Sequence, residues 1–163
     1  MNTCKYCGQL LKAIGTKENI PYFSCSFCEM EFSVEETCID RQRISVIPAL
    51  LEDSNIYQTT QQFLERDTIT LYHVLKEIRS FWYNLKTLLE SAKKQMAGDA
   101  VLESAITNMT EEYKLLTKKK FVVENIILER TGFFPEKLTE EFLDSVINQA
   151  LIASSKKMTV YLK

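Results

Sequence analysis

The sequence predicts a mainly α-helical protein, in which a small N-terminal β module is followed by an antiparallel helical bundle with a long helical hairpin. Two Cys-x-x-Cys pairs lie within the first 28 residues, which is where a compact cysteine-bound module fits. Glycine and proline are absent from residues 49–97, 99–131 and 136–163, so nothing in these stretches breaks a helix. The first two stretches also carry apolar residues at alternating steps of three and four, which is the period of packed helices.

Four of the five cysteines, Cys4, Cys7, Cys25 and Cys28, are spaced as C-x2-C-x17-C-x2-C, which is typical of zinc sites. Two residues between the cysteines of a pair let the chain turn so that both sulfurs face one ion about 2.3 Å away. Gly8 follows the first pair, where such a turn favours a positive φ. Disulfides are disfavoured by the odd number of cysteines and the expected cytoplasmic location. A thioredoxin-like redox motif would need one pair only, while an iron centre with four thiolates stays open as an alternative to zinc.

Residues 2 to about 36 resemble a zinc ribbon of the four-cysteine type, through CKYC at 4–7, CSFC at 25–28 and the hairpin pattern IPYFSCSFCEMEFS at 20–33. This resemblance implies one structural Zn²⁺ per chain, whose four thiolate ligands leave no coordination position open for a reaction. Glu29 stands where such ribbons often carry glycine, so we expect a strained or slightly different turn there. The rest of the chain resembles no family that we recognise.

The fifth cysteine, Cys38, lies outside this spacing. We expect a half-buried small residue where the ribbon meets the helices, with a reactive thiol as the alternative.

The first long helix is predicted over residues 67–97, because Asp67-Thr68 are good N-cap residues. Three further apolar residues, Val74, Phe81 and Leu88, widen its apolar stripe, so we expect it to meet more than one partner helix. The heptad seam of this helix consists of Leu71, Leu75, Ile78, Trp82, Leu85, Leu89, Ala92 and Met96.

The second long helix is predicted over residues 99–131, with Gly132 as the residue that follows its C-terminal end. The short connection makes the two helices antiparallel neighbours, each about 45 Å long. Lys120 is the one charge in the second seam, and we expect it to extend toward Glu77 or to specify the register of pairing. That seam consists of Leu102, Ile106, Met109, Tyr113, Leu116, Lys120, Val123 and Ile127.

A third helix is predicted from Thr139 to about Ser155, and the closing MTVYL at 158–162 is interpreted as a short strand or a frayed tail. Before the hairpin, Thr59-Thr60 caps a short helix that contains QQFLER. The predicted domains are a zinc ribbon at 1–38, a linker with short helices at 39–66 and a helical hairpin or bundle domain at 67–163.

Charge is evenly distributed along the chain. It contains 20 basic and 22 acidic residues, and no segment carries the basic excess that binding to a phosphate backbone normally requires. No apolar run approaches the ~20 residues that cross a bilayer, and MNTCKYCG lacks the apolar stretch of a signal peptide. We therefore expect a cytoplasmic protein that does not associate with membranes, and nucleic-acid binding is possible but not supported by charge.

The first long helix contains two candidate functional features, a histidine and a run of aromatic residues. His73, the one histidine, lies off the seam with Glu77 one turn later, and a solvated helix face is the simplest interpretation. The aromatic run FWYN at 81–84 is expected mainly to pack in the core, but Trp82 and Tyr83 are candidate partner-binding residues because such rings dominate protein interfaces.

These patterns favour a non-enzymatic regulatory or adaptor protein, with the ribbon as a docking head on a helical body that binds another protein or a second copy of itself. The alternative is a nucleic-acid-binding protein associated with transcription or replication machinery, which rests on analogy with other zinc ribbons.

Overall fold

The computed structural model describes residues 1–43, 55–95 and 100–159. It confirms a mainly α-helical chain with small N-terminal sheets and a packed helical hairpin. The chain divides into two compact units, one formed by Met1–Ile47 with Ile147–Lys163 and the other by Pro48–Val146. The domain boundaries predicted after residues 38 and 66 stay predictions. Within the described ranges, no helix is both long enough and apolar enough to cross a membrane.

The N-terminal module contains two small antiparallel sheets, with strand orders β2-β3-β4 and β1-β5. Strands β2 and β3 are joined by a two-residue turn at Glu18 and Asn19, whose φ values of 52° and 66° match the tight hairpin turns in which both central residues are left-handed. In the second sheet, Thr3 pairs with Cys38. The elements are β1 (Asn2–Thr3), β2 (Lys12–Lys17), β3 (Ile20–Cys25), β4 (Met30–Ser33), a 3₁₀ turn η1 (Val34–Glu36) and β5 (Cys38–Ile39).

The predicted helices are present, with ends that agree to within a few residues. The structure places α1 at Thr60–Glu65, α2 at Thr68–Gln95, α3 at Ala100–Thr131 and α4 at Glu140–Ser155. Of the short helices predicted within the linker at 39–66, α1 is present, and residues 44–54 lie outside the described residues. The segment MTVYL is described only to residue 159, and its described residues form no strand.

The helix ends are stabilised as the sequence predicts. Thr59 and Gln62 form a capping box at α1, and the Asp67 carboxylate accepts a 2.9 Å hydrogen bond from the backbone N–H of Thr70 at α2. The Thr139 hydroxyl accepts a 3.2 Å hydrogen bond from the N–H of Phe142 at α4. Gly132 has φ of 80° just after α3, a conformation that suits glycine.

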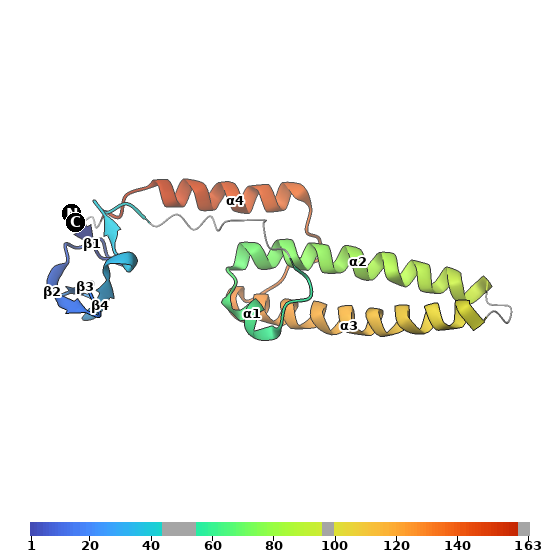
Figure 1. Cartoon of the computed structure of the whole chain (residues 1–163). Helices are drawn as coiled ribbons and strands as arrows, with labels where there is room; N and C mark the ends of the chain where they lie inside the picture. The colour runs from blue at the N-terminus through green and yellow to red at the C-terminus, as the bar shows by residue number, and fades with distance from the viewer. Residues whose placement is uncertain (44–54, 96–99, 160–163) are drawn as a thin grey trace. The chain divides into compact units, whose positions relative to one another are not determined.

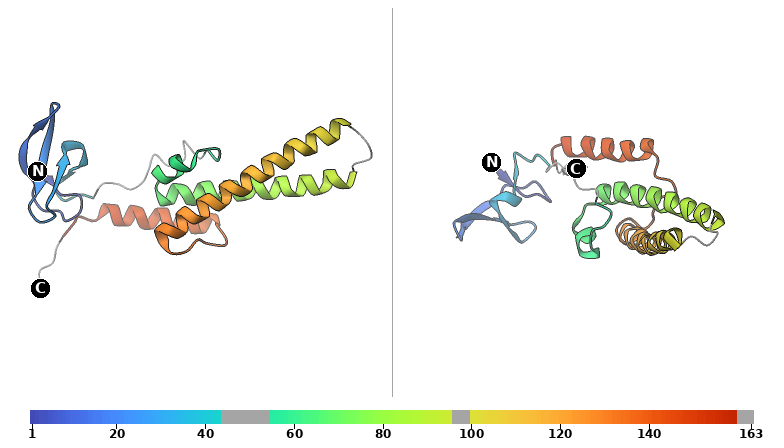
Figure 2. Two further views of the ribbon diagram at one scale, coloured as in Figure 1. Left: turned by 90° about the horizontal axis from the view of Figure 1, so that it is seen from below. Right: turned by 45° about the vertical axis from the view of Figure 1, so that its right-hand side comes forward.

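Helices α2 and α3 run side by side as an antiparallel hairpin, and α1 packs against α3 near the end of the hairpin opposite its connecting loop (Figures 1 and 2). Tyr72 of α2 meets Phe142 of α4 edge to face, with ring centroids 5.5 Å apart. Each fully buried aliphatic or aromatic side chain contributes about 1.5–3 kcal/mol of burial free energy. The buried core of this unit, which we call the helical core, contains Ile56, Phe63, Leu71, Tyr72, Val74, Leu75, Ile78, Leu116, Val123, Ile126, Ile127, Leu138 and Leu143.

Only part of the apolar stripe on α2 that contains Val74, Phe81 and Leu88 is buried in the core. Val74 is fully buried, but Phe81 and Leu88 are 55% and 59% exposed. Two helices packed alone cover only the seam between them, so the flanking residues of the distal hairpin stay at the surface. The prediction that this whole face meets several helices is therefore wrong beyond Ile78, which is the last fully buried residue of α2 in the helical core.

His73 differs from its predicted place on a solvated face. Its Nε2 atom is buried and makes no hydrogen bond within the part of the chain that the structure describes. The reason is that the first two turns of α2 are covered on more sides than the seam, since Leu71, Tyr72 and Val74 are all buried.

Arg79 connects three segments of the helical unit, a role that the sequence analysis did not assign. Its guanidinium donates to one carboxylate oxygen of Glu124 at 2.9 and 3.2 Å and to the backbone oxygens of Pro135 and Glu136 at 2.9 and 3.0 Å. Since both charged side chains are mostly buried, this ion pair fixes the α3–α4 connection against α2.

Candidate metal centre

Two similar turns, which we call knuckles, bring the four paired cysteines together. The first knuckle is Cys4–Gly8, and the second is Cys25–Glu29, which forms the turn between β3 and β4. In each, the last residue donates its N–H to the carbonyl of the first cysteine, at 2.9 Å in both cases. The second knuckle thus lies in the hairpin that the sequence predicts.

The four sulfurs lie at metal-binding separations. Sγ of Cys4 is 3.8 Å from that of Cys28, Sγ of Cys7 is 3.5 Å from that of Cys25, and all four lie within 4.8 Å of one another. A tetrahedral ion with ~2.3 Å bonds to sulfur separates its ligands by about 3.8 Å. The predicted grouping is confirmed, and all five cysteines are free thiols.

The backbone is arranged to stabilise sulfur in its ionised form. The N–H of Tyr6 donates to the sulfur of Cys4 at 3.5 Å, and the N–H of Cys28 donates to the sulfur of Cys25 at 3.4 Å. Burial opposes ionisation of Cys25, but N–H groups of Cys28 and Phe27 outweigh it and lower its pKa to about 7. Burial and the neighbouring sulfurs raise the pKa of Cys28 to about 12, as expected where negative charges gather. A divalent cation among the four sulfurs would remove this mutual repulsion.

Glu29, which stands where such ribbons often carry glycine, has the strained backbone conformation that was expected. Gly8 and Glu29 occupy the same place in their knuckles and both have positive φ, 71° and 53°. Glycine adopts this conformation freely, whereas a residue with a Cβ is strained there. The turn itself is preserved, because its hydrogen bond has the same length in both knuckles.

Cys38 does not join the four-sulfur cluster. It is 3% exposed in strand β5, where its carbonyl accepts a 3.1 Å hydrogen bond from the Thr3 hydroxyl. Cys38 was expected to be half-buried where the ribbon meets the helices, but it is buried within the module, because β5 pairs with β1.

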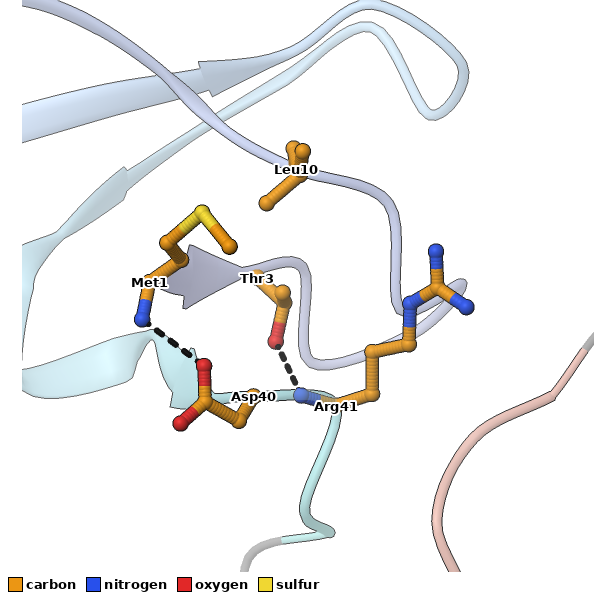
Figure 3. A pocket seen from close by; sticks show the side chains of 5 residues that line it. All are labelled: Met1, Thr3, Leu10, Asp40 and Arg41. Atoms are coloured by element: carbon orange, nitrogen blue, oxygen red, sulfur yellow. Dashed lines mark hydrogen bonds and ion pairs between the residues drawn. The ribbon is translucent and has the colours of Figure 1, made fainter.

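A cavity of about 250 Å³ lies where β1 meets β5, lined by Met1, Thr3, Leu10, Asp40 and Arg41 (Figure 3). The N-terminal ammonium pairs with Asp40 at 2.8 Å and lowers the pKa of that carboxyl. The Thr3 hydroxyl accepts from the Arg41 N–H at 3.1 Å and donates to Cys38, so its hydrogen bonds are already made. These polar groups join the two strands and leave the cavity with little to offer a ligand.

The two aromatic candidates on α2 differ in their surroundings. Trp82 donates its indole N–H to the Thr117 hydroxyl at 2.9 Å and stacks on Tyr113, with ring centroids 5.5 Å apart. The Lys120 ammonium, which was expected to extend toward Glu77 or to set register, lies 4.1 Å from the centre of the Trp82 ring. Tyr83 is 65% exposed. Partner binding by this pair stays a prediction, and Tyr83 is the member that the surface presents.

Sequence reasoning missed the surroundings of the two knuckles. Tyr6 and Phe27 hold the third position of their Cys-x-x-Cys motifs and are 63% and 71% exposed. Within the predicted hairpin at 20–33, Phe27 lies in the turn between β3 and β4. The shared position within CKYC and CSFC is the signal that could have identified them.

Models of known protein families, curated proteins and solved structures were compared with this chain, and none matches it.

Proposed function

We propose that this chain is a non-enzymatic regulatory or adaptor protein, in which one structural zinc ion holds the N-terminal module as a docking head and the helical hairpin is a protein-binding body. The observation that carries the proposal is the cluster of four cysteine sulfurs at tetrahedral separations. Thiolates select zinc, and four of them complete its coordination, so the ion has a structural role.

Two further observations support a role in protein binding. Residues 1–45 contain five basic and six acidic residues, and a divalent ion bound by four thiolates adds a formal charge of about −2. A surface of this sign repels a phosphate backbone. The module and the distal hairpin also expose large apolar side chains, among them Phe27, Phe81 and Leu88.

The metal part of the proposal is tested on the full-length protein by elemental analysis and X-ray absorption. We expect about one zinc per chain and a shell of sulfur alone at about 2.3 Å. An oxygen ligand with exchangeable water in place of one sulfur would show an open site and contradict the structural role.

The adaptor part is tested by capture from native lysate and by light scattering. We expect a specific protein partner or a dimer, lost when Tyr83 is changed to Ala or when the module is disrupted by Cys25→Ser. Retention on heparin at about 50 mM salt, with steep salt dependence, would instead favour the nucleic-acid alternative.

A further inference from the structure

The two knuckles have the same backbone but different cation surroundings. In the first, the Lys5 ammonium lies 5.4 Å from the ring centres of both Tyr6 and Phe32, and it pairs with Glu36 at 3.0 Å. The aromatic ring and the carboxylate thus hold one cation between them, which is a favourable arrangement for an ammonium or guanidinium group. The chain itself supplies this cation.

The second knuckle has the ring and a carboxylate but no cation. Ser26 stands where Lys5 stands in the first knuckle, and Phe27 is 71% exposed. Within the described residues, no lysine or arginine lies over the Phe27 ring or pairs with the exposed Glu29. The Phe27 ring is therefore open to contact with a group from outside the module.

Glu29 adds a carboxylate to the same turn. Its φ of 53° would cost less with glycine, the residue found at the same place in the first knuckle. Glu29 places an exposed carboxylate two residues from Phe27. The thiolate-bound ion adds negative charge to the same turn.

We propose that the second knuckle, through Phe27 and Glu29, binds an arginine side chain from a basic segment of a partner protein. The guanidinium lies over the Phe27 ring and pairs with the Glu29 carboxylate, as Lys5 lies over Tyr6 of the first knuckle and pairs with Glu36 of η1. Arginine fits better than lysine because its planar group stacks on rings and is less strongly hydrated. This inference rests on the proposed function and names the chemistry of the partner.

A nucleic-acid base could also stack on an exposed ring, but the charge of this surface argues against it. A nucleotide brings a phosphate toward Glu29 and the thiolate-bound ion, where repulsion opposes binding. An arginine side chain is attracted both by the Phe27 ring and by the negative charge of Glu29.

The test uses the full-length, zinc-loaded protein and a fluorescein-labelled peptide of alternating glycine and arginine, measured by fluorescence anisotropy. The comparison peptide has glutamine in place of arginine, and a labelled oligothymidine probes nucleic acid. We expect binding of the arginine peptide alone, weakened about threefold or more by Phe27→Ala and by Glu29→Gln.

Matched variants separate the knuckle from general charge attraction. Glu35→Gln removes the same charge from another exposed position of the module and should leave the affinity nearly unchanged. Glu29→Gly should weaken binding as Glu29→Gln does while relieving the strained φ, so lost binding cannot be ascribed to a damaged fold. Zinc content and the amide NMR spectrum verify each variant.

Equal affinity of wild type, Phe27→Ala and Glu29→Gln for the arginine peptide would overturn the assignment, as would preferential binding of oligothymidine. Neither result affects the zinc shell or the captured partner, so the proposed function is judged separately. Conversely, an open zinc site would contradict the proposed function without changing the peptide result.

Discussion

The N-terminal module and the helical unit differ in the kind of residues that form their buried cores. In the module, the buried cluster consists of Cys4, Cys25 and Phe32, with Cys7, Cys28 and Leu11 packed beside it, so most of it is the sulfur of the four clustered cysteines. The helical core is built from aliphatic and aromatic side chains alone. A region of about 40 residues rarely buries enough apolar surface to fold without a metal or disulfides. An ion held by these four sulfurs would stabilise a module that is too small to form an apolar core of its own.

Metal removal gives the largest expected difference between the two regions. A chelator, or the substitution Cys25→Ser, should unfold the module, because binding of structural zinc contributes on the order of 10 kcal/mol to small domains. The helices should keep their circular dichroism, since their core contains no ligand. Loss of most helical signal on chelation would show that the two regions do not fold independently.

Lowering the pH should also disrupt the N-terminal module before the helical unit. Zinc binds thiolates, and the pKa of the Cys25 thiol is about 7. Below that pH each ligand must lose a proton to bind, so affinity falls steeply as pH falls, whereas the apolar helical core titrates little. Zinc release measured with a colorimetric chelator is expected to precede loss of helical signal. Simultaneous transitions would contradict this order.

A substitution in the helical core should destabilise the helical unit and leave the N-terminal module intact. Phe63 of α1 is fully buried, and Phe63→Ala is expected to lower the free energy of unfolding of the helical unit by about 3–5 kcal/mol with zinc content unchanged. The control Leu88→Ala, at a 59% exposed site, should cost less than about 0.5 kcal/mol. Urea denaturation followed by circular dichroism measures both. Equal costs would mean that the distal face of α2 is covered in solution.

The Arg79 network should contribute less than the core but more than a surface pair. Arg79→Ala leaves the mostly buried Glu124 without its partner and is expected to cost about 1–3 kcal/mol. Lys86→Ala removes an exposed pair with Glu90 at 4.0 Å and should cost under about 0.5 kcal/mol. A similar small value for both, measured by urea denaturation, would show that Arg79 does not hold the α3–α4 connection.

The two knuckles should respond with opposite signs to exchanges at their last residue. Gly8→Ala is strained at φ of 71° and places a Cβ 2.9 Å from that of Met158, so it should destabilise the module by about 1–2 kcal/mol. Glu29→Gly relieves strain and should stabilise it by up to about 1 kcal/mol. Zinc retention against a competing chelator measures both effects. Destabilisation by Glu29→Gly would show that the carboxylate contributes to the fold itself.

Local rules determined a large part of this structure. The spacing of Cys4, Cys7, Cys25 and Cys28 was sufficient to predict their cluster, because two knuckles can direct sulfurs at one point with few other constraints. Capping residues and glycines placed the helix ends, since these signals act within one turn of the chain. The heptad seam identified Leu71, Leu75 and Ile78 as buried for the same reason.

Tertiary structure alone decided which flanking residues are covered. The 3.6-residue period places Val74 and Phe81 on one stripe, but only Val74 is buried, because burial beside the seam depends on how far the neighbouring helices extend. The contacts of Arg79 with Glu124, Pro135 and Glu136 join residues 45 to 57 positions apart, beyond the reach of any local pattern. The contacts of Lys5 with Phe32 and Glu36 likewise follow from long-range packing, since these two residues come from a different part of the module. The spacing of residues in the sequence determines the side of a helix or turn on which each side chain lies. Whether that side chain is exposed depends on which distant segments of the chain pack against that side.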